Sequence, residues 1–329
     1  MTTKRTIAIV AGGDSSEYTV SLKSAHGLYS FMDKERYQLY IVCIHGQEWK
    51  VFLSPDDEKS AVEIDRSDFS FNEGGKKVSF DFAYITIHGT PGENGILQGY
   101  FDLLRIPYST SGVLIEALTF NKFFLNQYLK GFGVRISDSL MLRRGQHITE
   151  DEVIEKIGLP CFIKPDDGGS SFGVTKVKTR EEIEPAIEKA FAEGTEVMIE
   201  AFMKGTEITC GCYHTKDKKV VFPISEVVPK DEFFDYDAKY NGRVDEITPA
   251  RLSPELTGRV QALTTAIYEI LGCQGIIRID YIITQGETIN LLEINTTPGM
   301  TPTSFIPQQV RAAKLDIKEV LTDIIENKF

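Results

Sequence analysis

The side chains best suited to chemistry lie on two short runs near the end of the chain. Residues 276–280 and 291–295 alternate between apolar and polar side chains, which is typical of strands with one buried face. If residues 285–288 form a four-residue hairpin loop between them, Asp280 lies directly across from Glu293. Two carboxylates in that position repel each other, which destabilises the hairpin unless a cation lies between them. The pattern therefore predicts a cation site.

The same register places Arg278 across from Asn295. Carboxylate and amide oxygens are hard ligands suited to Mg²⁺, which takes few protein groups and completes its octahedron with phosphates. Asp280, Glu293 and Asn295 are thus candidate ligands of such an ion. The alternative is a solvated polar face in which Arg278 neutralises the two carboxylates.

A lysine followed by a glycine- and serine-rich loop is the second feature. Lys164 ends an apolar run, and the segment 164–173 offers a cation, backbone N–H groups and hydroxyls to an oligophosphate. The chain has neither a Walker A run nor a G-x-G-x-x-G fingerprint, so no P-loop or dinucleotide motif supports this interpretation. Taken alone, the segment is more simply a hairpin turn.

Two polar loops follow apolar runs in the first third of the chain. Residues 12–17 precede a helical pattern, so Glu17 is either a ligand-binding carboxylate or a helix cap. Residues 88–95 follow a second run, the usual place for ligand contacts in an open α/β sheet. A single histidine such as His88 is otherwise more often structural.

The elements that must position the first two loops alternate between strands and helices. Strand patterns cover residues 6–10, 37–44 and 82–87, and helical patterns cover 20–28 and 96–104. Parallel strands joined by crossover helices follow from this order. We therefore expect a first α/β domain over residues 1–115.

Beyond that boundary, the pattern indicates a helix from Leu118 and then strand, loop, strand and helix. Strand patterns cover residues 158–164, 174–177 and 196–200, and a helical pattern covers 179–192. Thr179 and Glu182 have the spacing of a capping box at the start of that helix. We place a second domain at 116–199 and a third at 200–329.

Composition limits the partners and the compartment. Forty-eight acidic residues against 36 basic ones give a net charge of −12, which argues against nucleic acid and anionic membranes as partners. Five scattered cysteines without a CxxC pair fit a reduced cytoplasm, and Cys210 and Cys212 are expected to pack together on one strand face. The sequence has no run of about 18 apolar residues, so no membrane span is predicted.

Four segments, in order, resemble the motifs of the D-alanine:D-alanine ligases of the ATP-grasp superfamily, and the resemblance covers nearly the whole chain. The matching residues are Gly12, Gly13, Ser15, Glu17, Val20 and Ser21; 88–95; Lys164, Pro165, Gly169, Ser170, Ser171 and Gly173; and 278–280 with Glu293, Asn295, Thr296, Pro298, Gly299, Met300 and Thr301. The resemblance implies a Rossmann-like parallel-sheet domain followed by a two-part α+β ATP-grasp module.

The resemblance also implies roles around ATP and metal. Residues expected to contact ATP are Lys122 and Lys164 at the phosphates, Glu200 and Glu207 at the adenine amine and ribose, and Ser171 and Lys239. Asp280, Glu293 and Asn295 are expected to hold two Mg²⁺, with Mn²⁺ as a substitute.

Other residues are expected to contact D-alanine. Glu17 would bind the ammonium of the first D-alanine, with His88 nearby, and Ser170 and Tyr240 would join Glu17 to a lid loop at 233–240. Arg278 and the Gly299 backbone would stabilise charge on the reacting carbonyl. Ser304 and Phe305 would shape the subsite of the second D-alanine. The chain departs from the family pattern at Tyr18, Thr19, Asn121 and Phe234, which concerns local detail.

The implied reaction is ATP-dependent joining of two D-alanines through an acyl phosphate, with release of ADP and phosphate, for peptidoglycan precursor synthesis. A cytoplasmic homodimer is expected. One alternative is a sister ligase using D-lactate or D-serine, although Tyr240 matches the dipeptide-forming members. A nicotinamide oxidoreductase and a non-catalytic nucleotide-binding regulator are the alternatives from other classes.

Overall fold

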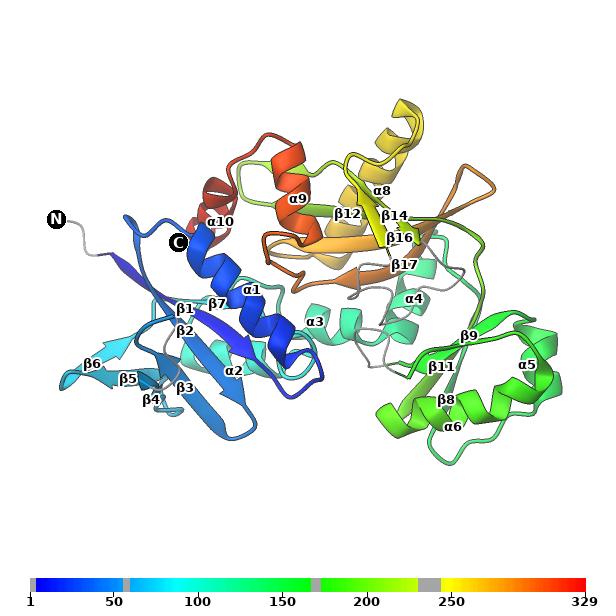
Figure 1. Cartoon of the computed structure of the whole chain (residues 1–329), viewed down its shortest axis with the longest axis horizontal. Coiled ribbons are helices and arrows are strands. Elements are labelled where there is room, and N and C mark those ends of the chain that lie inside the picture. The colour runs from blue at the N-terminus through cyan, green and yellow to red at the C-terminus, as the bar shows by residue number, and fades with distance from the viewer. Residues whose placement is uncertain (1–3, 56–59, 167–172, 230–243) are drawn as a thin grey trace.

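The computed structural model describes residues 4–55, 60–166, 173–229 and 244–329. Within those ranges the strands form a five-stranded, a four-stranded and a six-stranded sheet and a separate hairpin. The first sheet lies at one end of the molecule and the four-stranded sheet at the other, with the six-stranded sheet between and above them in the view of Figure 1.

The first sheet contains the predicted parallel core. Its strands, in spatial order, are β4 (Val62–Glu63), β3 (Glu48–Phe52), β2 (Tyr37–His45), β1 (Arg5–Gly12) and β7 (Phe82–Ile85), and its helices are α1 (Tyr18–Phe31) and α2 (Ile96–Leu104). Strand β1 runs parallel to both β2 and β7, as the order of elements predicted. Helix α2 has the predicted bounds, whereas β7 ends two residues earlier than expected.

Smaller elements complete the first part of the chain. A hairpin of β5 (Ser70–Glu73) and β6 (Lys76–Ser79) packs aromatic side chains beside the sheet, and α3 (Val113–Phe120) and α4 (Lys122–Lys130) follow. These two helices cover the helical pattern predicted from Leu118. In Figure 1 they lie between the first sheet and the four-stranded sheet.

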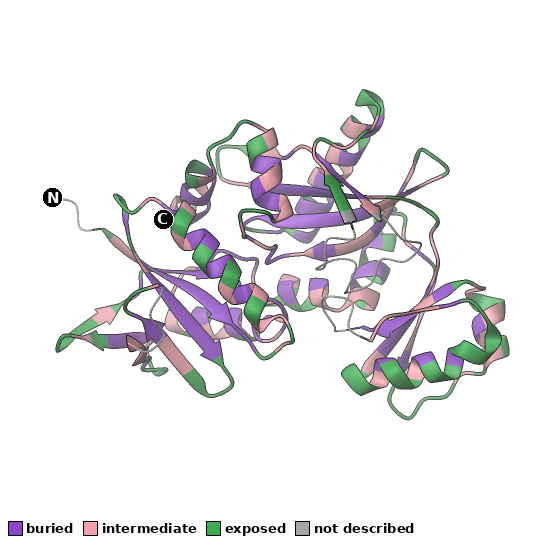
Figure 2. Cartoon of the chain, viewed as in Figure 1, coloured by how far each residue is buried: buried purple, intermediate pink, exposed green. Residues whose placement is uncertain are grey.

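The four-stranded sheet carries the predicted strand, loop and strand. Its strands are β10 (Thr175–Val177), β9 (Cys161–Pro165), β11 (Glu196–Ala201) and β8 (Ser139–Arg143), and its helices are α5 (Glu150–Lys156), η2 (Arg180–Glu182) and α6 (Ile183–Glu193). Glu182 accepts the Thr179 N–H at 3.2 Å, so the predicted capping interaction is present. Figure 2 shows the outer faces of α5 and α6 exposed to solvent.

Strand β8 and helix α5 were not predicted. Most of β8 is only half-buried at the edge of its sheet, so its sequence lacks the continuous apolar run of a central strand. Helix α5 begins with a capping box formed by Thr149 and Glu152, a signal that could have identified it.

The six-stranded sheet is antiparallel and carries the predicted hairpin. Its strands, in order, are β15 (Val244–Ile247), β14 (Ser225–Pro229), β12 (Gly205–His214), β16 (Ile277–Thr284) and β17 (Thr288–Asn295), with β13 (Lys219–Val221) also paired to β12; its helices are α8 (Pro254–Leu271), α9 (Phe305–Ala312) and α10 (Ile317–Glu326). Buried Cys210 and Cys212 lie in the core beneath α8, as expected. All five cysteines are buried and free.

The register of the β16–β17 hairpin agrees with the prediction at its functional end. Asp280 pairs with Glu293 and Arg278 with Asn295. The predicted four-residue loop is wrong, because Thr284 pairs with Thr288 and leaves three residues between them. A β-bulge beside Asp280 adds the missing residue and restores the predicted register.

Alternation along β16 separates its core face from its polar face. Ile277, Ile279 and Tyr281 pack in the core that includes α8. The intervening Arg278 and Asp280 therefore point to the other face of the sheet. This pleat presents charged groups at the opposite surface while apolar burial holds the strand in place.

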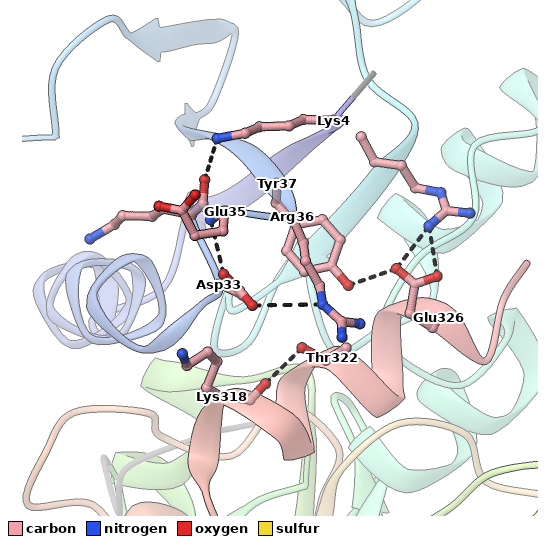
Figure 3. Close-up of polar contacts among 10 residues, drawn as sticks. Lys4, Asp33, Glu35, Arg36, Tyr37, Lys318, Thr322 and Glu326 are labelled. Carbon is pink, nitrogen blue, oxygen red and sulfur yellow. Dashed lines mark hydrogen bonds and ion pairs between the residues drawn. The ribbon is translucent and has the colours of Figure 1, made fainter. Parts of the chain in front are cut away.

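Helix α10 packs against the first domain although it follows the third sheet in sequence. Its residues Val320, Leu321, Ile324 and Ile325 belong to the same buried cluster as the strands of the first sheet. Figure 3 shows Glu326 accepting a hydrogen bond from the Tyr37 hydroxyl. Glu326 also accepts from Arg5. The division into residues 1–115, 116–199 and 200–329 stays a prediction. No helix among the described residues is long and apolar enough to cross a membrane.

Candidate active site

A cleft of about 490 Å³ lies where loops of the first domain meet the four- and six-stranded sheets. This volume is within the range of about 300–1,000 Å³ typical of small-molecule sites. The predicted site residues that line it are Glu17, His88, Lys122, Lys164, Glu200, Glu207, Arg278, Asp280, Glu293, Asn295 and Phe305. Gly299 and Ser304 are not among the lining residues, although Ser304 directly precedes Phe305 in the chain. Ser170, Ser171, Lys239, Tyr240 and the predicted lid at 233–240 lie outside the described residues.

The polar face of the β16–β17 hairpin forms one wall. Arg278 bonds both carboxylate oxygens of Asp280, at 2.9 and 2.8 Å, and both side chains are nearly buried. Burial alone would lower the pKa of Arg278, but the charge and hydrogen bonds of Asp280 outweigh it and raise that pKa. Asn295 Nδ2 donates to Asp280 at 3.1 Å and lies 3.5 Å from Glu293.

This arrangement contains the ion pair that the polar-face interpretation predicted. It also contains the oxygen ligands that the metal interpretation requires. The carboxylates of Asp280 and Glu293 are in register, and a flip of the Asn295 amide would turn its oxygen toward them. Among the described residues, no group of three or more His, Cys, Asp or Glu side chains could hold a metal ion. Two carboxylates and an amide fit Mg²⁺, because that ion completes its shell with phosphate and water oxygens.

A second buried ion pair lies across the cleft, on β9 and β11. Lys164 Nζ is 2.6 Å from Glu200 Oε1, and the two side chains are 11% and 5% exposed. Burial lowers the pKa of Lys164, but the charge and hydrogen bond of Glu200 more than compensate and the pKa is raised. The predicted phosphate lysine and the predicted adenine carboxylate thus bond to each other.

The first turn of α4 is fixed to the end of β9. The Phe123 N–H donates to Asp166 Oδ1 at 2.8 Å, and Lys122 Nζ donates to the Asp166 carbonyl at 3.3 Å. This brings the cations of Lys122 and Lys164 to the same cleft although they come from different elements.

Two loops of the first domain form the opposite wall. Ser15 Oγ donates to the His88 carbonyl at 2.7 Å, which joins the loop at 12–17 to the loop at 88–95. Glu17 stands at the N-cap of α1, yet its side chain makes no capping hydrogen bond to any described residue of that helix. The structure therefore gives no support to the cap interpretation of Glu17.

Glu93 was missed, although it lies in the matching segment at 88–95. Its carboxylate accepts the Gly89 N–H at 2.7 Å. Burial, and then the charge of Glu17, raise its pKa to about 7. Lys176 and Phe202 were also missed: the ammonium of Lys176 lies 3.6 Å from the centre of the Phe202 ring in the cleft wall. Neither of these two carried a recognisable sequence signal.

The turn that precedes α9 completes the site. Ser304 Oγ accepts the Thr301 N–H at 3.1 Å, and a Cβ at Gly299 would lie 2.9 Å from that oxygen. The Phe305 ring centre lies 5.5 Å from the guanidinium carbon of Arg278. The predicted carbonyl-binding and second-subsite residues are thereby close together.

The same turn packs tightly on α1. Ser24 Oγ accepts the Met300 N–H at 3.2 Å, and a Cβ at Gly27 would lie 2.2 Å from the Met300 carbonyl oxygen. Glycine at this point lets the turn approach α1, the helix whose N-cap is Glu17.

Comparisons with known proteins agree with this geometry. Models described as D-ala D-ala ligase N-terminus and C-terminus match residues 6–111 and 128–326. The chain is 74% identical over 326 residues to a D-alanine–D-alanine ligase of Phocaeicola vulgatus, covering 99% of this chain and 100% of that one.

Solved structures give the same result. The VanG D-Ala:D-Ser ligase of Enterococcus faecalis superimposes with a TM-score of 0.87 at 30% identity, covering 99% of this chain and 100% of that one. D-alanyl-alanine synthetase A of Vibrio cholerae superimposes with a TM-score of 0.88 at 28% identity, covering 100% of this chain and 99% of that one. The predicted fold class, a Rossmann-like α/β domain followed by a two-part ATP-grasp module, is confirmed.

Proposed function

The chain belongs to the D-alanine:D-alanine ligase family, and from this premise we propose how it joins two D-alanines at the expense of ATP for peptidoglycan synthesis. The observation that carries the proposal is the meeting of Asp280, Glu293, Lys122 and Lys164 in one cleft. A site for two amino acids alone has no need of two lysines beside an acidic hairpin. An oligophosphate with its metal requires both the two lysines and the acidic hairpin.

The first step forms an acyl phosphate. A carboxylate oxygen of the first D-alanine bonds to the γ-phosphorus of ATP, and the bond from that phosphorus to the β-bridging oxygen breaks, so ADP leaves with the electron pair. Lys122 and Lys164 supply positive charge for the phosphates. Because an ammonium has three N–H donors, Lys164 can contact the phosphates while it keeps its bond to Glu200.

The second step forms the amide. The second D-alanine loses an ammonium proton, its nitrogen bonds to the acyl carbon, and the bond from that carbon to the phosphate oxygen breaks; phosphate leaves and a further proton is lost from nitrogen. Arg278 and the Gly299 N–H stabilise the negative charge on the carbonyl oxygen during attack. Glu17 binds the ammonium of the first substrate, and Ser304 and Phe305 contact the second.

Asp280, Glu293 and Asn295 would hold Mg²⁺, or Mn²⁺ in its place, because they offer hard oxygens in the same cleft as the two lysines. When bound, the metal supplies positive charge that neutralises the oligophosphate. The ion pair with Asp280 means that Arg278 must share that carboxylate with the metal or turn toward the substrate.

We also propose that the enzyme is a cytoplasmic homodimer. Ile96, Leu103 and Leu114 are 61%, 86% and 75% exposed on α2 and α3. Apolar side chains gathered on neighbouring helices are typical of a protein interface. Leu103→Glu should then convert a dimer to a monomer in sedimentation equilibrium without changing the circular-dichroism spectrum, and an unchanged mass would remove this surface from consideration.

The activity is tested by phosphate release from ATP with Mg²⁺, with and without D-alanine, and by mass spectrometry of the product. We expect D-alanine-dependent release and D-alanyl-D-alanine. Equal D-serine or D-lactate in the same mixture tests the sister activities, because the D-Ala:D-Ser ligase shares this fold. Predominance of a mixed product would contradict the assignment of the second substrate while sparing the ATP-dependent step.

A further inference from the structure

The side chain of Gln309 on α9 is fully buried and bonds to the backbone of β12. Its Oε1 accepts the Gly211 N–H at 2.9 Å, and its Nε2 donates to the Thr209 carbonyl at 3.0 Å. A carboxamide has the donor and the acceptor of a peptide group. Gln309 therefore pairs with β12 as a residue of a neighbouring strand would.

This bond lies where the edge of β12 passes from one partner strand to another. Strand β14 pairs with β12 as far as Ser225 opposite Thr209, and β13 pairs with it from Val221 opposite Cys212. The backbone N–H between these stretches is satisfied by Gln309 instead of by a strand. Gln309 Nε2 also donates to Ser225 Oγ at 3.1 Å, so the side chain holds both sides of the interval.

Glycine at position 211 permits this close approach of α9. A Cβ there would lie 2.4 Å from Ile306 Cδ1, 2.8 Å from Gln309 Oε1 and 2.9 Å from Phe222 Cδ2. Such distances are far inside van der Waals contact, so any larger residue would push the helix away from the sheet. The contact is therefore specific in its spacing as well as in its hydrogen bonds.

The fastened part of β12 lies beside the reacting groups. Thr209 pairs with Asp280 on β16, and Gly211 pairs with Arg278. The helix held there begins at Phe305, whose ring lies over the Arg278 guanidinium. Figure 1 shows α9 over the sheet that contains β12 and β16.

We propose that Gln309 is a positioning residue for the second substrate, an inference that rests on the proposed function. By fastening α9 to β12, it holds Ser304 and Phe305 at a fixed distance from Arg278 and so defines where the attacking amine is held. When this fastening is loosened, water competes with the amine for the acyl phosphate. Water bonds to the acyl carbon, the carbon–oxygen bond to phosphate breaks, and D-alanine and phosphate are released with one proton.

The test is Gln309→Met in the full-length enzyme, which keeps the length and apolar volume of the side chain but removes its donor and acceptor. We expect the apparent KM for the second D-alanine to rise about tenfold, while the KM for the first D-alanine and for ATP stays within about twofold. The ratio of phosphate released to dipeptide formed should rise above one. A merely structural role would leave that ratio at one.

A matched control is Thr264→Val on α8, which covers the other face of the same sheet. It removes one buried hydrogen bond, between Thr264 Oγ1 and the Tyr281 hydroxyl at 2.9 Å, without changing the shape of the side chain. Because this variant loses one buried hydrogen bond and Gln309→Met loses three, we expect a smaller fall in Tm, with both KM values and the product ratio unchanged. If Gln309→Met gives this same pattern, the proposal is wrong.

A milder variant decides the matter if Gln309→Met does not fold. Ser225→Ala removes one of the three hydrogen bonds of Gln309, together with the bond between Ser225 Oγ and Thr248 Oγ1, and should produce a smaller rise, about threefold, in the second KM and a ratio above one. Unchanged kinetics in Ser225→Ala would overturn the proposal. A failure of the underlying ligase function would be visible beforehand, since the unmodified enzyme would then form no dipeptide.

Discussion

The cleft and the α10 contact both contain ion pairs of similar length but in different surroundings. In the cleft, Lys164–Glu200 at 2.6 Å and Arg278–Asp280 at 2.8 Å have side chains that are at most 11% exposed. The cost of removing such charges from water offsets their attraction, so well-packed apolar residues would stabilise the fold as well or better. The buried pairs are therefore better explained by function than by stability.

At the α10 contact, Arg5 and Glu326 lie 2.6 Å apart with side chains 37% and 36% exposed. Water screens such a pair, and its contribution is small. The docking of α10 rests instead on the apolar cluster beneath it. The comparison indicates that ion pairs of similar length differ in burial: those in the cleft are nearly buried and belong to the proposed active site, whereas the pair at α10 is partly exposed and contributes little to the interface.

The largest expected effect is that of Glu293→Gln, which removes one charge of the predicted metal site. We expect turnover to fall roughly 1,000-fold or more, because charge stabilisation at the phosphates is lost, while the fold is kept. Phosphate release and thermal melts measure the two quantities. Wild-type turnover in this variant would show that the metal-site interpretation is wrong.

Asp280→Asn serves as the companion variant. It should abolish turnover too, but it also leaves the buried Arg278 without its bonded counter-charge and should lower stability more than Glu293→Gln does. Equal melting temperatures of the two variants would contradict the importance of that ion pair.

Glu200→Gln tests the second cleft pair through stability. It leaves Lys164 buried without its counter-charge, and we expect the free energy of unfolding to fall by about 3–5 kcal/mol. Urea denaturation at neutral pH measures this. Addition of saturating ATP should recover part of the loss, because its phosphates replace the missing charge.

The pH dependence of stability should report Glu93. Its pKa is raised from 4.5 to about 7 in the folded protein, so the folded state holds the proton more tightly than the unfolded state. Stability contributed by the protonated carboxyl is complete below about pH 4.5 and is lost as pH rises through about 7. Because the cleft admits water, we expect the free energy of unfolding to fall by about 2 kcal/mol or less over this pH range.

The control for that prediction is Glu93→Gln, which cannot titrate. Its unfolding free energy should fall less steeply than that of the unmodified protein between pH 5 and 7, as followed by urea denaturation at each pH. Parallel curves for the two proteins would contradict the raised pKa.

The smallest expected effect is that of Glu326→Gln. Its ion pair is half exposed, and the neutral amide oxygen can still accept from the Tyr37 hydroxyl, so stability should change by about 1 kcal/mol or less. Turnover should be unchanged. A loss as large as that of Glu200→Gln would remove the distinction between the two regions.

Much of the first domain could be predicted because its central strands are buried on both faces. Continuous apolar runs identify β1 and β2, and the glycines at 12 and 13 separate β1 from helix α1. Strand β8 lacks such a run because it is a half-buried edge strand. The bulge beside Asp280 was not predicted either. The extra residue lies in β17, and it changes neither the composition nor the alternation of β16.

Most residues around the cleft could be predicted from ordered motifs. Their partners could not: the bond between Lys164 and Glu200 depends on the pairing of β9 with β11. The burial of Glu93 and the bond of Gln309 to β12 depend on how separate elements meet. A single sequence shows local periodicity but contains no direct signal for contacts between elements that are distant in the chain.

The position of α10 has a consequence for the order in which the molecule can form during synthesis. Ile7 and Ile9 on β1 precede Leu321 and Ile325 by more than 300 residues in the chain, yet all four side chains belong to one core. A nascent first domain, residues 1–115, therefore leaves the ribosome with an uncovered apolar face, and its core is completed only after about 210 further residues have been made. During that interval the uncovered face is open to chaperones and to other nascent chains.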